Sequence, residues 1–325
     1  MQTRFPPALL DQPAMAASEA VIRKCVHCGF CLATCPTYVL LGDELDSPRG
    51  RIYLIKEMLE NERDPTAEVV KHIDRCLSCL SCMTTCPSGV NYMHLVDHAR
   101  AYIEQRYKRP WRDRVLRGLL ASILPDPGRF RLALALARLA RPARPIFAAA
   151  PALKPVAAML ALAPGRLPPT ASKADAPAAA SKGRVALLQG CVEPVLRPEI
   201  REATVRLLNR AGYDVVFAKG EACCGSIVHH MGREQAGLDA ARRNVAAWTR
   251  EIETAGLDAI IVTASGCGVT IKDYGFMLRD DPACAEDAAR VSALAQDISE
   301  FLGGIDLPPG NGGGLAVAYH AACSL

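Results

Sequence analysis

Two cysteine runs with the same spacing restrict what this chain can fold into. The first extends from Cys25 to Pro36 and the second from Cys76 to Pro87, and both read C-x2-C-x2-C-x3-C-P. Cysteines at i, i+3 and i+6 fold into one tight loop, whereas the fourth sits one helical turn further on and points the other way. The proline that follows restricts this fourth cysteine to an extended backbone and turns the chain away.

This spacing is that of a bacterial two-cluster ferredoxin, in which the fourth cysteine of each run binds the other cluster. A zinc ribbon pairs two separate C-x2-C knuckles and has no use for a third cysteine at the next step. We therefore expect two [4Fe-4S] clusters, with structural zinc as the alternative and no disulfides. The predicted ligand sets are crossed: Cys25, Cys28, Cys31 and Cys86 for one cluster, and Cys76, Cys79, Cys82 and Cys35 for the other.

Length and composition favour a multidomain protein of a reducing compartment. The chain has 325 residues, of which half are apolar, so two or three domains with a sizeable core are expected. Its 14 cysteines indicate reducing surroundings. Residues 1–24 lack the basic start and apolar run of a signal peptide, and no long apolar stretch is free of charges and prolines. We therefore expect a cytoplasmic protein.

The charge of the chain is concentrated in one stretch. Residues 106–144 contain ten Arg and one Lys against two Asp, a net charge of +9, so the remainder carries −5 of the total of +4. A uniformly basic protein of the nucleic-acid-binding kind is therefore not expected. The stretch is either a solvated basic face on helices that pack on the ferredoxin part, or a dock for an anionic membrane surface or an acidic partner subunit.

The first half of the chain reads as helical. A short helix is expected to start at Ser18 as its N-cap, and others follow where apolar residues recur at helical spacing. The further helices are expected at residues 52–59, 68–75, 96–109, 111–124 and 130–139. Residues 165–183 are rich in Pro, Ala, Ser and Lys with little periodicity, which predicts a linker.

After this linker the pattern changes to alternating strands and helices. Short apolar runs predict strands at residues 185–188, 214–218, 259–263 and 315–319, with helices at 199–211 and 234–254 between them. This alternation indicates a parallel α/β unit. The predicted fold class is therefore α+β multidomain: a mainly helical, two-cluster ferredoxin-like domain followed by an α/β cysteine-rich domain.

Cysteines follow the predicted strands of this second half. Cys191, Cys267 and Cys323 each come just after a strand, and Cys223-Cys224-Gly225 follows another. Ligands bind at the carboxyl edge of an open parallel sheet, so a site is expected there. The strand-then-cysteine pattern recurs at the end of the chain, which predicts the start of a second, apparently truncated copy. The predicted domains are residues 1–105 (ferredoxin-type), 106–164 (basic helical connector), 165–183 (linker), 184–314 (cysteine-rich α/β) and 315–325 (second copy).

Three short runs resemble a known family. Cys35-Pro-Thr-Tyr38, the run Asp-Ser-Pro-Arg-Gly-Arg-Ile from Asp46 to Ile52, and Cys86-Pro-Ser-Gly-Val90 resemble the iron–sulfur subunits of glycolate oxidase. The second half is similar to the "CCG" cysteine-rich domain, which also occurs in heterodisulfide reductases, anaerobic glycerol-3-phosphate dehydrogenase and lactate-utilisation proteins. The order of ferredoxin part and CCG part covers almost the whole chain.

The resemblance implies a complex in which a flavin subunit oxidises glycolate to glyoxylate. This chain would relay the electrons to a membrane acceptor such as quinone, peripherally at the inner face of the cell membrane. No G-x-G-x-x-G follows a predicted strand, so neither a flavin or nicotinamide site nor catalytic residues are expected here. The alternatives are a lactate or glycerol-3-phosphate dehydrogenase subunit, a heterodisulfide-reductase-like catalytic subunit, or a zinc-binding scaffold.

One departure concerns the CCG part. The heterodisulfide reductase type ends in C-x-x-C and binds an unusual cluster, whereas this chain reads Cys267-Gly-Val-Thr270. Threonine supplies no thiolate. The set Cys191, Cys223, Cys224 and Cys267 is still a candidate site for a metal or cluster. Buried structural cysteines, or a redox pair of the two adjacent cysteines, are the alternatives.

Overall fold

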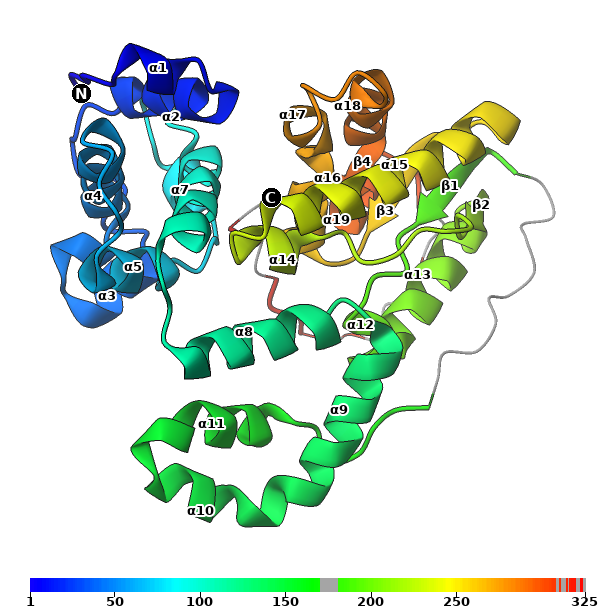
Figure 1. Ribbon diagram of the computed structural model, residues 1–325. Helices are drawn as coiled ribbons and strands as arrows, with labels where there is room; N and C mark the ends of the chain where they lie inside the picture. Colours follow the sequence, from blue (N-terminus) through cyan, green and yellow to red (C-terminus); the bar gives the residue numbers. More distant parts are fainter. Residues whose placement is uncertain (170–180, 308–309, 311–313, 315, 320–321, 324–325) are drawn as a thin grey trace. The chain divides into compact units, whose positions relative to one another are not determined.

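The computed structural model describes residues 1–169, 181–307, 310, 314, 316–319 and 322–323 (Figure 1). The chain divides into two compact units. The first contains Met1–Arg114, Val228–Gly237 and Ala318–Leu325, and the second contains Val115–Ile227 and Leu238–Val317. The domain boundaries expected from the sequence stay predictions.

Helices make up the first unit up to residue 106. They are α1 (Pro7–Leu10), α2 (Pro13–Lys24), α3 (Pro36–Leu41), η1 (Glu44–Asp46), α4 (Pro48–Glu60), α5 (Ala67–Asp74), α6 (Ser81–Thr84) and α7 (Tyr92–Arg106). The helices predicted at residues 52–59, 68–75 and 96–109 are confirmed by α4, α5 and α7. The predicted start at Ser18 is wrong, because α2 begins at Pro13 and the Ser18 hydroxyl donates to the Ala14 carbonyl in mid-helix.

Local signals in the sequence explain where these helices begin. Ser47 caps α4 by accepting a hydrogen bond from the Gly50 amide, and Pro48 occupies the first turn. Asn91 caps α7 in the same way. The helices bury one shared apolar core, and its fully buried members come from α2, α4, α5 and α7: Ile22, Ile55, Leu59, Ile73, Leu95 and Ile103. This core is the support for the cysteine loops.

A helical segment opens the second unit. It consists of α8 (Trp111–Ile123), whose residues from Val115 onward belong to this unit, α9 (Pro127–Ala140), η2 (Arg141–Ala143), α10 (Arg144–Ala149), η3 (Pro151–Leu153) and α11 (Lys154–Leu162). The predicted helices at 111–124 and 130–139 are confirmed by α8 and α9. Most of the predicted linker lies outside the described residues. Among the described helices, none is long and apolar enough to cross a membrane.

A parallel four-stranded sheet forms the centre of the second unit. Its strands are β1 (Gly183–Leu187), β2 (Tyr213–Val216), β3 (Ala259–Val262) and β4 (Ala295–Asp297), in the order β2-β1-β3-β4. Because β2 lies on one side of β1 and β3 on the other, the topological switch point falls between β1 and β3.

Helices cover both faces of this sheet. They are α12 (Glu193–Leu196), α13 (Pro198–Arg210), α15 (Glu234–Ala255), α16 (Ser265–Lys272), α17 (Tyr274–Met277), α18 (Ala285–Leu294) and α19 (Ile298–Gly303). The short helix α14 (Ser226–His230) and the start of α15 lie mostly in the segment Val228–Gly237 of the first unit. Side chains alternate along the strands, so Ile260 joins the core with Trp248 of α15, and Ile261 joins the core with Leu208 of α13. The predicted parallel α/β architecture is confirmed.

The fourth strand was predicted at the wrong place. The structure has it at Ala295–Asp297, whose sequence Ala-Gln-Asp lacks the β-branched residues that signal a strand. Of the predicted strand at 315–319, residue 315 lies outside the described residues, and residues 316–319 form no strand. Of the predicted second copy at 315–325, residues 315, 320–321 and 324–325 lie outside the described residues.

Candidate iron–sulfur and cysteine sites

The first cavity collects cysteines from both runs. Cys25, Cys28 and Cys31 of the first run line it together with Cys86 and Cys82 of the second. Cys25 directly follows the last residue of α2, and Cys86 comes two residues after α6. The structure thus brings together the four cysteines of the first predicted ligand set, with one further thiol beside them.

The second cavity has the complementary composition. Cys76, Cys79 and Cys82 of the second run line it together with Cys35 of the first. Cys35 caps the start of α3, where Pro36 is the first helical residue. The fourth cysteine of each run therefore lies at the cavity of the other run, as crossed ligand sets require.

The two cysteine loops share an unusual backbone. His27 and Ser78 occupy equivalent positions in the two runs and have φ angles of 62° and 51°. Gly29 and Leu80 are the next equivalent pair, with φ angles of 88° and 63°. Residues other than glycine rarely adopt such angles, and they persist where the surrounding structure or a bound group holds them. The repeated conformation fits loops that wrap around a cluster.

Several thiols at these two cavities have perturbed pKa values. Burial raises the pKa of Cys31, Cys79 and Cys82 above the usual thiol value. Iron binds the thiolate, so loading would release protons from these groups and replace hydrogen with metal. None of the described cysteines forms a disulfide. The residues present therefore fit iron–sulfur clusters.

A buried cation lies beside the second cavity. Arg51 of α4 is 1% exposed, and its Nη1 lies 3.9 Å from the Cys35 sulfur. Its Nε donates to the His72 carbonyl at 2.7 Å, and its Nη2 donates to the Thr37 hydroxyl at 3.0 Å. The guanidinium is thus fixed on several sides, with one edge directed at the sulfur of Cys35, a predicted cluster ligand.

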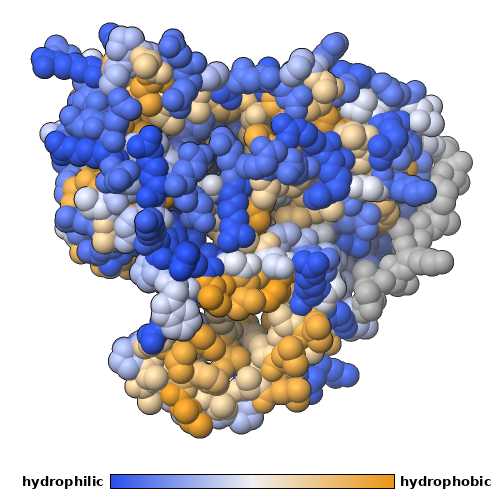
Figure 2. All heavy atoms as spheres, in the orientation of Figure 1, coloured by the Kyte–Doolittle hydropathy of each residue, from blue (hydrophilic) through white to orange (hydrophobic). Residues whose placement is uncertain are grey.

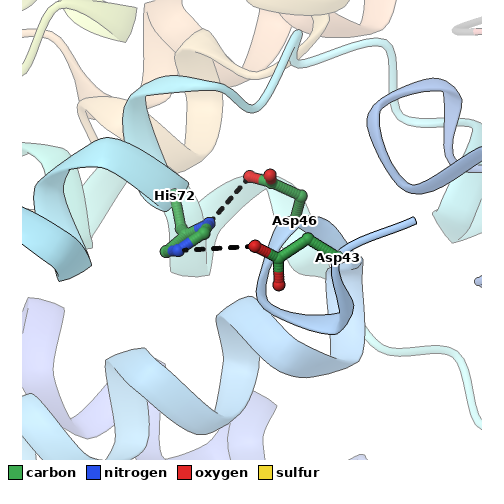
Figure 3. Close-up of side chains that lie close together, drawn as sticks. All are labelled: Asp43, Asp46 and His72. Carbon is green, nitrogen blue, oxygen red and sulfur yellow. Dashed lines mark hydrogen bonds and ion pairs between the residues drawn. The ribbon is translucent and has the colours of Figure 1, made fainter. Parts of the chain in front are cut away.

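Asp46 supplies the counter-charge to Arg51. Figure 3 shows His72 between Asp46 and Asp43, with a contact to each. The fully buried Asp46 carboxylate contacts His72 Nδ1 at 2.9 Å, Arg75 at 2.7 Å and Arg51 at 3.4 Å. Burial opposes its ionisation, but the hydrogen bonds from His72 and Arg75 outweigh this and lower the pKa of Asp46. Because both carboxylate oxygens are engaged, this cluster is an ion-pair network and needs no metal ion.

Two further residues that hold Cys76 were not identified from the sequence: Tyr92, which lines the second cavity, and Arg100. The Tyr92 hydroxyl, buried in the first turn of α7, donates to the Cys76 sulfur at 3.8 Å. Arg100, two turns further along α7, donates to the Cys76 carbonyl and the Ser78 hydroxyl, both at 2.6 Å. The only signal in the sequence is the spacing of Tyr92 and Arg100, which lie eight residues apart and therefore on one face of α7.

The second unit holds a separate cysteine cavity of about 230 Å³. Cys191 follows β1, Cys223 and Cys224 follow β2, and Cys267 lies in the first turn of α16 after β3. All four line this cavity, which opens at the carboxyl edge of the sheet at its switch point. Cys323 is exposed and is not among the lining residues.

The four thiols are hydrogen-bonded to one another. Cys191 and Cys224 both donate to Cys223, which lowers the pKa of Cys223 and raises the pKa of its two donors. Cys267 also hydrogen-bonds Cys224. A thiolate stabilised by neighbouring thiols is a ready ligand for a metal.

Buried polar residues hold the Cys-Cys-Gly turn in place. Asn244 of α15 donates to the Cys223 carbonyl at 3.2 Å, and the Tyr274 hydroxyl donates to the Cys224 carbonyl at 2.7 Å. Asn244 and Tyr274 are fully buried and bond each other at 3.1 Å. Neither was identified from the sequence, because each acts across a large separation in the chain.

Two other side chains near this turn bear on its chemistry. Glu221 accepts from the Trp248 ring nitrogen at 2.8 Å and from the Gln189 amide at 3.1 Å, and burial raises the pKa of Glu221 to about 7. Thr270 is buried, donates to the Gly266 carbonyl at 3.1 Å and does not line the cavity. The replacement of the last cysteine of C-x-x-C therefore leaves four thiols at this site.

Together, two ferredoxin-type cysteine loops on a helical core and a cysteine cavity on a parallel sheet define an iron–sulfur protein with a CCG domain. The family comparisons agree: residues 24–90 match the 4Fe-4S dicluster domain, and residues 185–272 match the cysteine-rich CCG domain. No solved structure matches the chain.

Comparison with whole proteins identifies the family. The chain is 42% identical over its full length to the glycolate oxidase iron–sulfur subunit of Escherichia coli (strain K12), and it covers 76% of that protein. It is 33% identical over 89% of its length to the probable glycolate oxidase iron–sulfur subunit of Bacillus subtilis (strain 168), covering 67% of it. Lactate utilization protein A of Bacillus licheniformis is 30% identical over 44% of the chain, which covers 58% of that protein.

The chain belongs to the family of glycolate oxidase iron–sulfur subunits. Membership gives it an iron–sulfur electron-transfer role as part of an oxidoreductase, and the resemblance seen in its short runs is confirmed.

Proposed function

We propose that this chain is the electron-transfer subunit of a glycolate dehydrogenase complex. In the proposed complex a flavin subunit oxidises glycolate to glyoxylate, and this chain passes the electrons to a membrane acceptor such as quinone. The subunit is then peripheral at the inner face of the cell membrane. The name of the Escherichia coli relative, a glycolate oxidase subunit, supports both the substrate and the presence of partner subunits.

The observation that carries the proposal is the exchange of cysteines between the two loops. Cys86 lines the cavity of the first run, and Cys35 lines that of the second. This supports two clusters with the ligand sets Cys25, Cys28, Cys31, Cys86 and Cys76, Cys79, Cys82, Cys35. Each run contributes to both sets, so the two sites are held close together.

When bound, a [4Fe-4S] cluster accepts and releases one electron at a time. In this proposal, four cysteine thiolates of the chain hold each cluster, and the surrounding residues exclude water from part of each site. Cys35 and Cys25 are buried, whereas Cys28 is exposed. The first site is thus open to a partner at one corner, which suits electron entry or exit at that corner.

Cysteine substitutions in the assembled complex test the relay. We expect Cys25→Ser and Cys76→Ser each to abolish glycolate-dependent dye reduction while the flavin content of the partner stays normal. Cys284→Ser is the matched control, because Cys284 lines none of the three cysteine cavities. Unchanged turnover in both ligand variants, with the iron content lowered, would show that electrons bypass this chain.

We further propose that Cys191, Cys223, Cys224 and Cys267 hold an additional metal or cluster. The supporting observation is their convergence on one cavity at the switch point of the sheet. Iron, zinc and sulfide analysis of anaerobically purified protein tests this. Cys224→Ser is expected to lose this metal and keep the ferredoxin signal in electron paramagnetic resonance (EPR) spectra, and equal metal content in both proteins would contradict the site.

The second candidate substrate is lactate, favoured by the similarity to lactate utilization protein A over 44% of the chain. The shorter match makes glycolate the first choice. Turnover of the assembled complex with each 2-hydroxy acid separates the two, since a complex that reduces dye with lactate and not with glycolate would favour the alternative.

A further inference from the structure

The helical segment that opens the second unit exposes an unusual amount of apolar surface. We call α9, α10 and α11 with their connections, residues 127–162, the basic apolar lobe. Leu139 of α9 and Leu162 of α11 are 78% and 85% exposed. Leu132, Leu136, Ile146, Leu153 and Met159 of the same lobe are also exposed. Figure 2 shows apolar residues gathered over these helices (labelled in Figure 1), and exposed patches of this kind mark interaction surfaces.

The charges of the lobe all have one sign. Residues 127–162 contain five Arg and one Lys, and no Asp or Glu. Arg138, Arg141, Arg144 and Lys154 are exposed around the apolar side chains. A surface that combines apolar side chains with unopposed positive charge is complementary to an apolar layer edged with negative groups.

We propose that the basic apolar lobe lies in the headgroup region of an anionic lipid bilayer. The apolar side chains would enter the boundary of the acyl chains, and the basic groups would lie at the lipid phosphates. In this proposal the lobe lies along the membrane surface and does not span it. None of the described helices is long and apolar enough to cross a bilayer. The inference rests on the proposed function, because it gives the electron-transfer subunit its contact with a membrane acceptor.

The composition of the lobe favours lipid over a protein partner. Binding energy between proteins concentrates on Trp, Tyr and Arg, with Leu under-represented. The exposed apolar residues here are Leu, Ile and Met, and the aromatic residues Phe130 and Phe147 are only partly exposed.

Vesicle binding by the full chain tests the proposal. The purified, cluster-loaded protein is sedimented with vesicles of phosphatidylglycerol and phosphatidylcholine, and with phosphatidylcholine alone. We expect the protein to bind the anionic vesicles, and we expect high salt to weaken this binding. Binding to neutral vesicles should be weaker. Leu139→Glu combined with Leu162→Glu should lower the affinity at least about tenfold. Leu40→Glu is the control, because Leu40 is an equally exposed leucine of α3, outside the lobe.

Arg138→Gln with Arg141→Gln provides a second variant that leaves the apolar residues in place. It should weaken binding to anionic vesicles and leave binding to neutral vesicles unchanged. Wild-type protein that stays in solution with anionic vesicles would overturn the proposal. Equal vesicle binding by the wild type and all variants would also overturn it. The same holds if the lobe mediates self-association or binding of flavin subunits while the protein does not bind vesicles. The proposed function is tested separately by iron content and EPR spectra, which lobe variants leave unchanged.

Discussion

Replacing Arg51 with methionine should lower the reduction potential of the cluster at the second cavity. The guanidinium lies 3.9 Å from the Cys35 sulfur and is fully buried, so it stabilises the extra negative charge of the reduced state. At an effective dielectric constant of about 20, unit charges at this separation interact by about 4 kcal/mol. Asp46, 3.4 Å from the same guanidinium, offsets part of this. If Asp46 cancels about half of this interaction, about 2 kcal/mol remains. For a one-electron couple about 1.4 kcal/mol corresponds to about 59 mV, so we expect the potential to fall by roughly 80 mV.

The assay is a reductive titration of the cluster-loaded protein followed by EPR. One potential should fall in Arg51→Met and the other should stay within about 20 mV. If this variant loses its iron, Tyr92→Phe is the milder test, because it removes only the hydroxyl that donates to Cys76 at 3.8 Å and should lower the same potential by a smaller amount. Tyr102→Phe, on the same helix with its hydroxyl bonded to the Arg63 carbonyl, is the matched control. Fully loaded Arg51→Met and Tyr92→Phe proteins with both potentials unchanged would refute the reasoning.

Three further substitutions test how the sites are held. Asp46→Asn should reduce the free energy of unfolding by about 3–5 kcal/mol, because it leaves Arg51 buried without its counter-charge. Since the pKa of Asp46 is lowered, the carboxylate stabilises the fold at every pH above the usual carboxyl pKa near 4. Denaturation should therefore show the same loss of stability in Asp46→Asn at pH 8 and at pH 5. A loss seen at only one of these pH values would contradict this assignment. Gly50→Ala would place a Cβ 2.0 Å from the Glu44 carbonyl, and we expect a loss of about 2 kcal/mol or more by denaturation together with lower iron content. Tyr274→Phe leaves a carbonyl of the Cys-Cys-Gly turn unpaired and should destabilise the second unit by about 1–3 kcal/mol, with the EPR signal of the ferredoxin part unchanged.

The sequence predicted which cysteines of the first unit line a common cavity, because short spacings within a loop determine which thiols can meet. Their role as cluster ligands stays a prediction. It did not predict their surroundings. Asp46 and Ser47 lie in a polar stretch that reads as an exposed turn, yet both are fully buried. Charged residues such as Arg51 are almost never buried unless paired, and its partners come from η1 and the end of α5. Such pairing depends on packing between helices, which no local pattern encodes.

The second unit shows the same division. Its first three strands were predicted because their apolar residues form short continuous runs, as in Ala259–Val262. The fourth strand, Ala295–Asp297, was missed because pairing with β3, and not side-chain character, makes it a strand. The convergence of Cys191 and Cys267 followed from the rule that parallel strands end at one edge. The supporting role of Asn244 did not, since it depends on where α15 crosses the sheet.

These results give a physical reason for the short run that carried the family resemblance. Asp46 fixes the buried charges, Ser47 and Pro48 start α4, and Gly50 allows the close approach of the preceding turn. Arg51 is thereby held with one edge on the sulfur of a cysteine. Every one of these tasks serves the surroundings of a cluster, and each limits the residue types that can perform it. The run therefore holds one buried positive charge beside Cys35, a predicted cluster ligand, where it would stabilise the reduced state of a cluster bound there.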